Sequence, residues 1–505
     1  MCSRYFAQEG DLFGNVAFMT SINGSGEYVF RTWDDENLPF CPGSPALNAD
    51  VFGREIGLGE PYRLETGYVI KKYCELCPDG EDSFCTCPED TPMLQGCIEQ
   101  TSIFYHPMVC GGGPTPTVNV QYKLIVIILD YSECGYAPNI TETEILELYQ
   151  DVAQKFEQCS HGTFKFSDVH AVRVAPPCSF LTTESCKSWA ISKDAEEALK
   201  QLLGVTSLMD DKYYSYVLPP GMAAVCGWAS QAELPGDRTW LQSNEYGVRR
   251  WATVMQSTLN NYGLWYAWGG DEPRADATTA MGTGDACPSA PELAHLQWAT
   301  SVGNGGGSIK KNTLTPAGRP LGWNLQATYL TNKNFLRVNT DWLSTYQNDT
   351  LGKDLYIALR VAKGGDVGLS SEYANKVHVH ESKAMALNTF QTGSAYQDHH
   401  NQIIQVLAPD SRAVLPAYNL VMYTGSLSAS DDINVYICRF TNSESECPAA
   451  NTLVQWPSMP PTSPLPPSPR PPPSPRPPPS PRPPSPQPSP APPPQEMPPS
   501  PLPSP

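Results

Sequence analysis

The sequence predicts a multidomain α+β protein that ends in an extended tail, and three observations lead to this fold class. The chain has 505 residues, which is more than one ordinary hydrophobic core contains. Between residues 118 and 304, segments with helical periodicity alternate with strand-like runs, whereas only strand-like runs follow up to residue 450. Beyond residue 456 the composition changes to serine and proline, and more than half of the 52 prolines lie there.

Residues 1–117 predict a small β domain held by disulfides. Short apolar runs such as Tyr28-Val29-Phe30 and Tyr68-Val69-Ile70 alternate with Gly, Pro and Asp turns. Several of the 16 cysteines are closely spaced in this region: Cys74, Cys77, Cys85, Cys87 and Cys97. Disulfides are the default, because this cysteine content is typical of proteins that fold in an oxidising compartment. A zinc knuckle is the alternative, although the Cys85-x-Cys87 spacing is unusual for one.

Residues 118–304 predict an α/β domain. The continuous apolar run from Tyr122 to Leu129 is typical of a buried central strand. A helix follows, because Thr141 and Glu144 form a capping box and apolar residues then recur on one helix face. The elements expected next, in order, are a strand at 163–174, a helix at 188–203, a strand at 213–218 and a helix that ends near Tyr262-Gly263.

Residues 305–450 predict a β-sandwich, since helical periodicity disappears and strand-like runs are separated by turn residues. Residues 451–505 predict a Ser/Pro-rich polyproline II tail, which at ~3.1 Å per residue reaches on the order of 150 Å. One interpretation of the tail is a docking ligand for proline-binding modules. The other is the hydroxyproline-rich, O-glycosylated rod of plant and algal wall glycoproteins, which the Ser-Pro repeats on a cysteine-rich chain favour.

Three sequons and the cysteine content predict a secreted glycoprotein, with acceptor sites at Asn23, Asn139 and Asn348. The first residues show no basic segment followed by an apolar stretch, so no signal peptide is visible and we interpret the start as a truncated or misassigned gene model. No run of about 20 apolar residues exists, and we expect no membrane span. The net charge of −19 argues against a nucleic-acid partner.

Two blocks carry the informative residues, from Met255 to Trp268 and from Ala280 to Leu293. Positions 256 and 260 lie four residues apart and therefore share one face of the predicted helix, with position 257 beside them. A glycine, Gly263, follows at the predicted end of the helix.

These blocks resemble those of the gametolysin family, which are metzincin-type metallopeptidases of green-algal cell walls. In that family a helix bearing His or Gln, Glu, two spacers and His turns at a glycine toward a third His, and a Met-turn lies below the metal. The resemblance covers residues 118–450 and implies a metzincin-like metallopeptidase domain at 118–304, while residues 1–117 are only loosely similar to a pro-region. The implied motif positions are Gln256, Asn260 and Tyr266 as ligands, Ser257 as general base, Gly263 as motif glycine and Met281 in the Met-turn.

The residues at these positions depart from the family pattern. Gln256 has precedent in the family, but Ser257 replaces the glutamate, and Asn260 and Tyr266 replace histidines. Amides and a neutral phenol are poor zinc ligands, and losing a general base alone costs about 10²–10⁴-fold in rate. We therefore expect no catalytic residue, no metal or other cofactor, and a hydrogen-bonded polar cluster in the place of the ion. The alternative is an atypical zinc or copper site with help from Asp271, Glu272, Asp276 or Asp285.

Two further groups are weaker metal candidates. His378 and His380 would share one face of a strand, and Asp398-His399-His400 is a dense polar triplet. A solvated surface is the more common outcome for a histidine pair on a strand, and we expect it here.

The sequence therefore favours a proteolytically inactive, metallopeptidase-like glycoprotein of the cell wall or extracellular matrix with a structural or binding role. The expected partners are matrix glycoproteins and their proline-rich segments. The alternative is an active metalloendopeptidase that cleaves hydroxyproline-rich wall glycoproteins through an atypical metal site.

Overall fold

The computed structural model describes residues 117–208, 212–346, 351–384 and 398–449, together with short segments between residues 12 and 105. The Ser/Pro-rich tail, the cysteine-rich stretch 74–87 and the sequons at Asn23 and Asn348 lie outside the described residues. Asn139 is described and exposed. The described residues form a mixed α+β fold, and no helix among them combines the length and apolar character needed to cross a bilayer.

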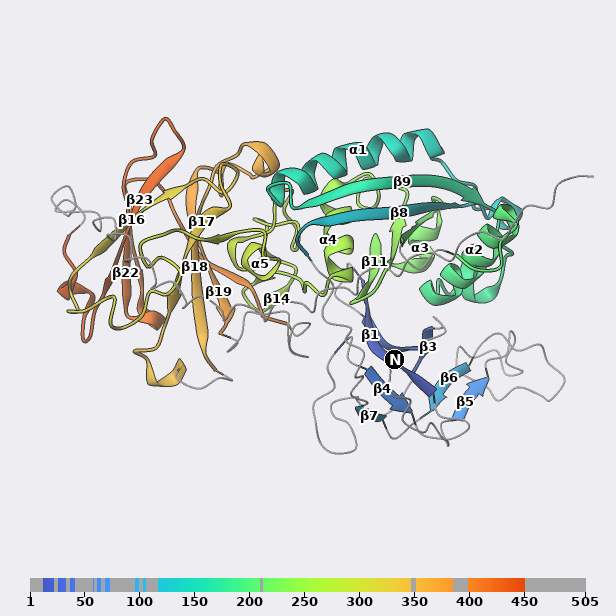
Figure 1. Ribbon diagram of the computed structural model, residues 1–505, viewed down its shortest axis with the longest axis horizontal. Helices are drawn as coiled ribbons and strands as arrows, with labels where there is room; N and C mark the ends of the chain where they lie inside the picture. Colours follow the sequence, from blue (N-terminus) through green and yellow to red (C-terminus); the bar gives the residue numbers. More distant parts are fainter. Residues whose placement is uncertain are drawn as a thin grey trace, which may run out of the picture. The chain divides into compact units, whose positions relative to one another are not determined.

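The largest sheet contains the apolar run that was predicted to be a buried strand. Its path is β3-β2-β1-β11-β12-β10-β8-β9, and Figure 1 shows β8 and β9 side by side. Strands β9, β8, β10 and β12 are parallel, whereas β11 is antiparallel to β12. Their bounds are β8 Val120–Leu129, β9 Phe164–Val174, β10 Tyr213–Leu218, β11 Ser230–Leu234 and β12 Arg238–Gln242.

Helices bury apolar side chains against both faces of this sheet. Leu124, Val126 and Ile128 of β8 belong to one core with α1 and α4, while Ile127 and Leu129 belong to another core with α2. The capping box predicted at Thr141 and Glu144 is present at the start of α1. The helices are α1 Glu142–Cys159, α2 Ser188–Leu203, α3 Met222–Cys226, α4 Trp251–Asn261 and α5 Ala290–His295.

The N-terminal region continues the large sheet. β1 pairs antiparallel with β2 along one side, and along its other side with β4 near its start and with β11 near its end. β5 and β6 form a separate two-stranded sheet. The bounds in this region are β1 Leu12–Ser21, β2 Gly26–Thr32, β3 Asn37–Pro39, β4 Pro61–Leu64, β5 Val69–Lys72, β6 Gly96–Glu99 and β7 Ile103–Tyr105.

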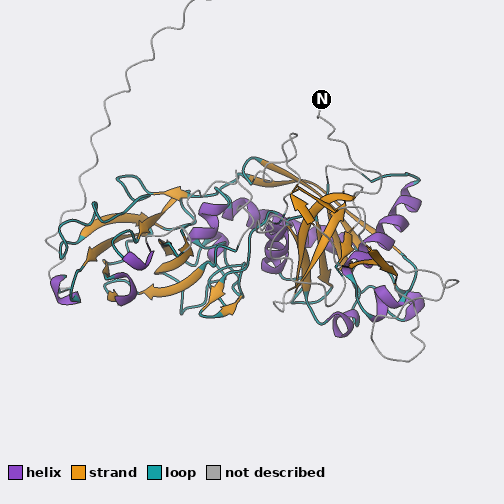
Figure 2. Ribbon diagram, turned by 90° about the horizontal axis from the view of Figure 1, so that it is seen from below, coloured by secondary structure: helices purple, strands orange, loops and turns teal. Residues whose placement is uncertain are grey.

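The C-terminal half contains two further sheets, in the orders β14-β13-β20-β19-β18-β17-β15 and β16-β23-β22-β21. Strands make up most of this half, with short helices between them (Figure 2). Leu355 and Ile357 of β18 lie in one core with Met422 of β22 and Val435 of β23, so side chains of both sheets share it. The first sheet contains β13 Trp268–Gly269, β14 Glu272–Pro273, β15 Thr300–Ser301, β17 Lys333–Asn339, β18 Lys353–Arg360, β19 Lys376–Lys383 and β20 Gln402–Leu407. The second contains β16 Leu321–Gln326, β21 Arg412–Leu415, β22 Leu420–Thr424 and β23 Asp432–Arg439.

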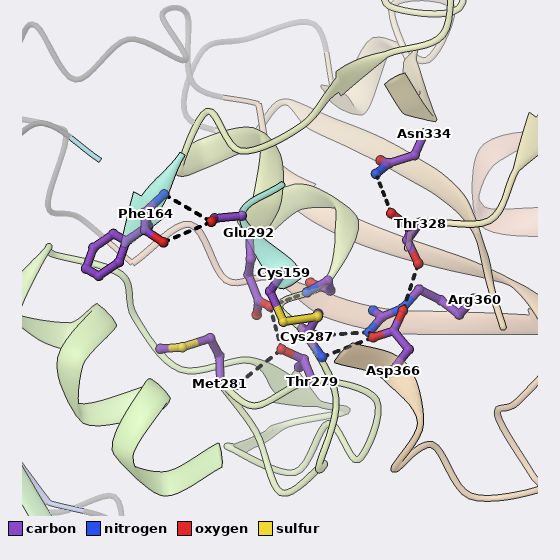
Figure 3. The surroundings of a disulfide bond; sticks show 12 residues. Cys159, Phe164, Thr279, Met281, Cys287, Glu292, Thr328, Asn334, Arg360 and Asp366 are labelled. Carbon is purple, nitrogen blue, oxygen red and sulfur yellow. Dashed lines mark hydrogen bonds and ion pairs between the residues drawn. A yellow bond between two sulfur atoms is a disulfide. The ribbon is translucent and has the colours of Figure 1, made fainter. Parts of the chain in front are cut away.

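A disulfide and an ion pair hold the segment before α5 from two sides (Figure 3). Cys287 is bonded to Cys159 at the end of α1. The Cys287 amide donates to Asp366 Oδ1 at 3.0 Å, and Arg360 Nη2 donates to the Cys287 carbonyl oxygen at 2.9 Å. Arg360 and Asp366 are both buried and also bond each other, with Nε to Oδ2 at 2.8 Å. The other disulfides among the described residues are Cys134–Cys178, Cys186–Cys226 and Cys438–Cys447.

Candidate functional site

Helix α4 carries the motif positions, and residues Ala252 to Asn261 are all buried. It packs through Met255 and Leu259 into the core that it shares with α1. The helix ends where the sequence predicts, because Gly263 adopts the left-handed conformation with φ +83° and its amide donates to the Asn260 carbonyl oxygen at 2.7 Å. The chain then turns back and brings Tyr266 to the same region.

Gln256 connects the helix to the turn that contains Met281. Its Nε2 donates to the carbonyl oxygen of Gly282 at 3.2 Å, while its Oε1 accepts from Arg274 Nη2 at 3.0 Å. A side chain at position 282 would clash, since a Cβ there would lie 2.0 Å from the carbonyl oxygen of Asp276. The close approach of this turn to the loop at Asp276 therefore requires a glycine.

Asn260 and Tyr266 both form hydrogen bonds with Thr20. Asn260 Nδ2 donates to the carbonyl oxygen of Leu264 at 2.7 Å, and its Oδ1 accepts from the Thr20 hydroxyl of β1 at 3.4 Å. Burial raises the pKa of Tyr266, an effect that a hydrogen bond with Thr20 and the charge of Arg274 only partly oppose. Tyr266 is therefore a neutral phenol at ordinary pH.

Arg274 places a positive charge among these positions. Its Cζ lies 5.1 Å from the centroid of the Tyr266 ring, a cation–π geometry. Burial lowers the pKa of Arg274 to about 10. The charge of Arg250 also lowers this pKa, whereas Tyr266 raises it. The guanidinium is therefore charged at neutral pH. Within the described residues, Arg274 forms no ion pair with a carboxylate.

Neither Arg274 nor Thr20 was anticipated from the sequence. Arg274 lies outside the motif spacing and has a left-handed backbone, with φ +67°. One feature of the sequence could have drawn attention to Arg274: it is the single Lys or Arg between residues 251 and 294. Thr20 precedes Asn260 by 240 residues, and nothing local links the two.

The turn that contains Met281 is fixed by buried hydrogen bonds (Figure 3). The Met281 amide donates to Thr279 Oγ1 at 3.1 Å, and the Met281 carbonyl oxygen accepts from the Ala267 amide at 3.0 Å. Thr279 Oγ1 donates to Glu292 Oε2 at 2.6 Å, and the same oxygen accepts from the amide of Ser289. Glu292 therefore caps α5 and also supports the turn. Burial raises the pKa of Glu292, although these two hydrogen bonds oppose the rise.

The residues present do not fit a zinc ion. The Gln256 oxygen accepts from a guanidinium, Asn260 is engaged through both its amide atoms, and Tyr266 is a neutral phenol. A zinc site needs three or four imidazole, thiolate or carboxylate ligands. Across the part of the chain that is described, no three His, Cys, Asp or Glu residues gather closely enough to bind a metal.

The four acidic residues considered as extra ligands do not converge on α4. Asp271 and Glu272 are exposed. Asp285 pairs with Arg250, with Oδ1 and Nε 2.8 Å apart. Asp276 is buried and bonds His380 and Thr278.

The expectation that His378 and His380 are solvated is wrong, because both are buried in β19. His380 Nε2 lies 3.1 Å from Asp276 Oδ2 and so joins the second half of the chain to the loop before Met281. Burial would raise the pKa of Asp276, but hydrogen bonds and charge from His380 outweigh it and hold that pKa below the usual range. His378 Nε2 bonds the carbonyl oxygen of Tyr373 at 2.8 Å.

His378 makes the stability of the fold depend on pH. Burial lowers its pKa to about 3, and the charges of Arg360 and His380 add to the effect. Between about pH 6.5 and pH 3 the unfolded chain therefore binds one proton more at this residue than the folded chain, so stability falls as pH falls.

We expect His378→Asn to remove about 1.4 kcal/mol per pH unit from the pH dependence of the unfolding free energy between pH 6 and 4. Urea unfolding at several pH values measures this slope. His170→Asn is the control for the substitution itself, because His170 is exposed on β9 and its replacement empties no buried position. An unchanged slope in the His378 variant would contradict the assignment.

The triplet Asp398-His399-His400 fastens its segment to neighbouring elements. Asp398 Oδ2 accepts from Trp268 Nε1 at 3.1 Å, and the His400 ring lies 4.2 Å from that of Trp268. His399 packs 4.4 Å from the ring of His295, and burial lowers its pKa to about 4, with the charge of Lys383 adding to it.

Comparison with known proteins identifies the family. The model of the family described as Gametolysin peptidase M11 matches residues 123–417. Autolysin of Chlamydomonas reinhardtii is 25% identical over 218 residues, which are 38% of this chain and 34% of autolysin, so the match spans about a third of that relative. No solved structure matches. Because the family model covers more than half of the sequence, this chain belongs to the gametolysin peptidase family.

Proposed function

We propose that this chain is a secreted, glycosylated member of the gametolysin family that does not hydrolyse peptide bonds and has a structural or binding role in an algal cell wall or extracellular matrix. The observation that carries the proposal is the hydrogen bond from Arg274 to the amide oxygen of Gln256 at 3.0 Å. Gln256 is the one ligand position whose residue has precedent in the family. The amide oxygen that it would offer to a metal instead accepts a hydrogen bond from a guanidinium.

Electrostatics and hydrogen bonding both support an inactive site. A positive charge so close to the ligand positions repels a divalent cation, and the effect is strong because the groups are shielded from water. Ser257 stands at the position of the general base, and a hydroxyl does not accept a proton at neutral pH. Within the described residues the Ser257 hydroxyl has no hydrogen bond to a histidine, so a serine nucleophile is not supported either.

The sheet order supports a metzincin-like assignment for residues 118–304. Four parallel strands are followed by the single antiparallel strand β11, and α4 packs beside that strand. We keep the remaining divisions as part of the proposal: a pro-region-like domain at 1–117, a β-sandwich at 305–450 and a polyproline II tail at 451–505.

The proposed location rests on chemistry that suits an extracellular protein. Four disulfides lie among the described residues, and the sequon at Asn139 is exposed. The proline-rich tail has the composition of wall glycoproteins, and matrix glycoproteins with proline-rich segments are the partners that we propose. The relative named autolysin also belongs to an alga.

The full chain, purified from a secretory host, should contain well below one equivalent of zinc or copper and should leave gelatin intact. Mass spectrometry of bound metals and a gelatin assay with and without chelator measure these two outcomes. Stoichiometric zinc or copper together with cleavage that the chelator abolishes would support the alternative, an active metalloendopeptidase with an atypical site.

A further inference from the structure

The candidate site carries a positive charge at the place where the family motif would hold a cation. Its motif positions are occupied by neutral side chains: Gln256, Ser257, Asn260 and Tyr266. The charge comes from Arg274, whose Nη2 donates to Gln256 Oε1 at 3.0 Å. A site with this charge attracts an anion rather than a metal ion.

No carboxylate among the described residues neutralises this charge. Asp271 and Glu272 lie just before Arg274 in the chain, but both are exposed and neither forms an ion pair with it. The pKa of Arg274 agrees with this, because a nearby carboxylate would raise it. Instead, burial and the charge of Arg250 lower this pKa to about 10, and only Tyr266 opposes them.

The guanidinium also has hydrogen-bonding capacity that the described residues leave unused. A guanidinium donates hydrogen bonds from all three of its nitrogens. Nη2 of Arg274 donates to Gln256, but Nε is buried and has no acceptor among the described residues. A buried donor without an acceptor is unfavourable, and native structures rarely leave one unexplained. An anion at this side chain would supply the missing acceptor.

Several contacts hold Arg274 in place. Its Cζ lies 5.1 Å from the centroid of the Tyr266 ring. Its backbone has φ +67°, a conformation that is uncommon for residues other than glycine. Further along the same loop, Asp276 bonds Thr278 and His380. A cation that is already held in position loses less entropy when it binds a ligand.

The amount of positive charge favours a carboxylate over other anions. One guanidinium matches one negative charge, and its planar fork matches the two oxygens of a carboxylate. A phosphate dianion would call for a second cation. The nearby Arg250 is already engaged, because its Nε lies 2.8 Å from Asp285 Oδ1 and its Nη2 donates to the carbonyl oxygens of Thr283 and Gly284. Arg274 is only half-buried, so a small group can reach it from solvent.

We propose that the candidate site binds a carboxylate group through Arg274, while Gln256 and the ring of Tyr266 hold the guanidinium in place. The carboxylate belongs to a polypeptide, either as an acidic side chain or as a free chain end. This inference deepens the proposed function and rests on it, because it gives the binding role a ligand group and a bound metal would exclude that ligand.

The test follows how fast methylglyoxal, a small reagent that modifies arginine, reacts with Arg274 in the full-length chain. Mass spectrometry of the digested protein gives the rate at each arginine. Acetate should slow the reaction at Arg274 by at least about tenfold at saturation, with half of the effect on the order of 10 mM, as expected for one charge-assisted pair. Sodium chloride at the same ionic strength and neutral acetamide should give no protection. Arg319 is exposed and serves as the internal control, whose rate should not depend on acetate.

Two variants at position 256 supply or withhold a carboxylate within the protein. In Gln256→Glu the new side chain pairs with Arg274, so Arg274 should react slowly without acetate and gain no further protection from it. Gln256→Met is the matched neutral control and should stay sensitive to acetate. The measurement on the wild-type chain stands even if a variant fails to fold.

Two short peptides then replace acetate to distinguish the sources of the carboxylate. One has a glutamate side chain and an amidated end, and the other has a free end and no acidic side chain. The peptide that protects Arg274 at the lower concentration identifies the source. The proposal is overturned if Arg274 does not react at all, if acetate and chloride protect it equally, or if neither peptide protects it.

The metal content of the same sample separates this inference from the proposed function. A metal-free chain in which acetate gives no protection overturns only the binding of a carboxylate. Stoichiometric zinc with cleavage that a chelator abolishes overturns the proposed function, and the carboxylate site with it.

Discussion

Restoring the family motif with Ser257→Glu, Asn260→His and Tyr266→His yields weak zinc binding as long as Arg274 remains, and adding Arg274→Gln strengthens zinc binding by at least about a hundredfold. The reason is the charge next to the ligand positions. At about 5 Å and an effective dielectric constant near 20, a guanidinium repels a divalent ion by on the order of 5 kcal/mol. We expect only part of this effect, because Arg274 is half-buried and can turn toward solvent.

Competition with a fluorescent zinc chelator measures the two affinities. Arg274→Lys in the restored background is the matched control, since it keeps the charge and should bind zinc weakly. Arg250→Gln is a second control, because Arg250 is already neutralised by Asp285. Equal zinc affinities in the restored variants with and without Arg274 would show that the guanidinium does not exclude the metal.

Removing the disulfide Cys159–Cys287 with a double alanine variant lowers the free energy of unfolding by about 5 kcal/mol. The bond spans 128 residues, and closing a loop of that length removes about this much free energy from the unfolded ensemble. The loss also leaves Arg360 and Asp366 to hold the Cys287 segment alone. Urea unfolding of the oxidised proteins gives the difference directly.

Cys438–Cys447 provides the comparison within the same chain. It spans only 9 residues, so its double alanine variant should lose about 2.5 kcal/mol. The ratio of the two losses tests the loop-length argument separately from the loss of packing at each site. Losses of equal size, or a larger one at the short loop, would contradict it.

The sequence pattern predicted those helices and strands that depend mainly on neighbouring residues. The helix at 188–203 and the strand at 213–218 have the predicted bounds, because their periodicity and flanking residues specify them. The spacing of the motif also predicted where α4 ends, since Gly263 allows the left-handed turn.

Long-range contacts were beyond prediction. The pairing of β1 with β11 joins segments more than 200 residues apart, and no local signal specifies it. The burial of His378 was missed because the strand pattern assumes one solvated face, whereas β19 is buried along nearly its whole length. The position of Arg274 depends on a loop whose course is fixed by Asp276 and His380.

The contacts of Arg360 and Asp366 with Cys287 also bear on how such a gene can be rearranged. A gene that stopped at residue 304 would encode a chain in which the Cys287 amide and carbonyl oxygen lack these partners. A gene that began there would encode a chain in which the ion pair of Arg360 and Asp366 is no longer covered by the Cys287 segment. Recombination that separates the two halves near residue 304 therefore breaks the contacts that hold the Cys287 segment. The match to the family model, which runs from residue 123 to residue 417 across that boundary, has the extent expected of a unit inherited whole.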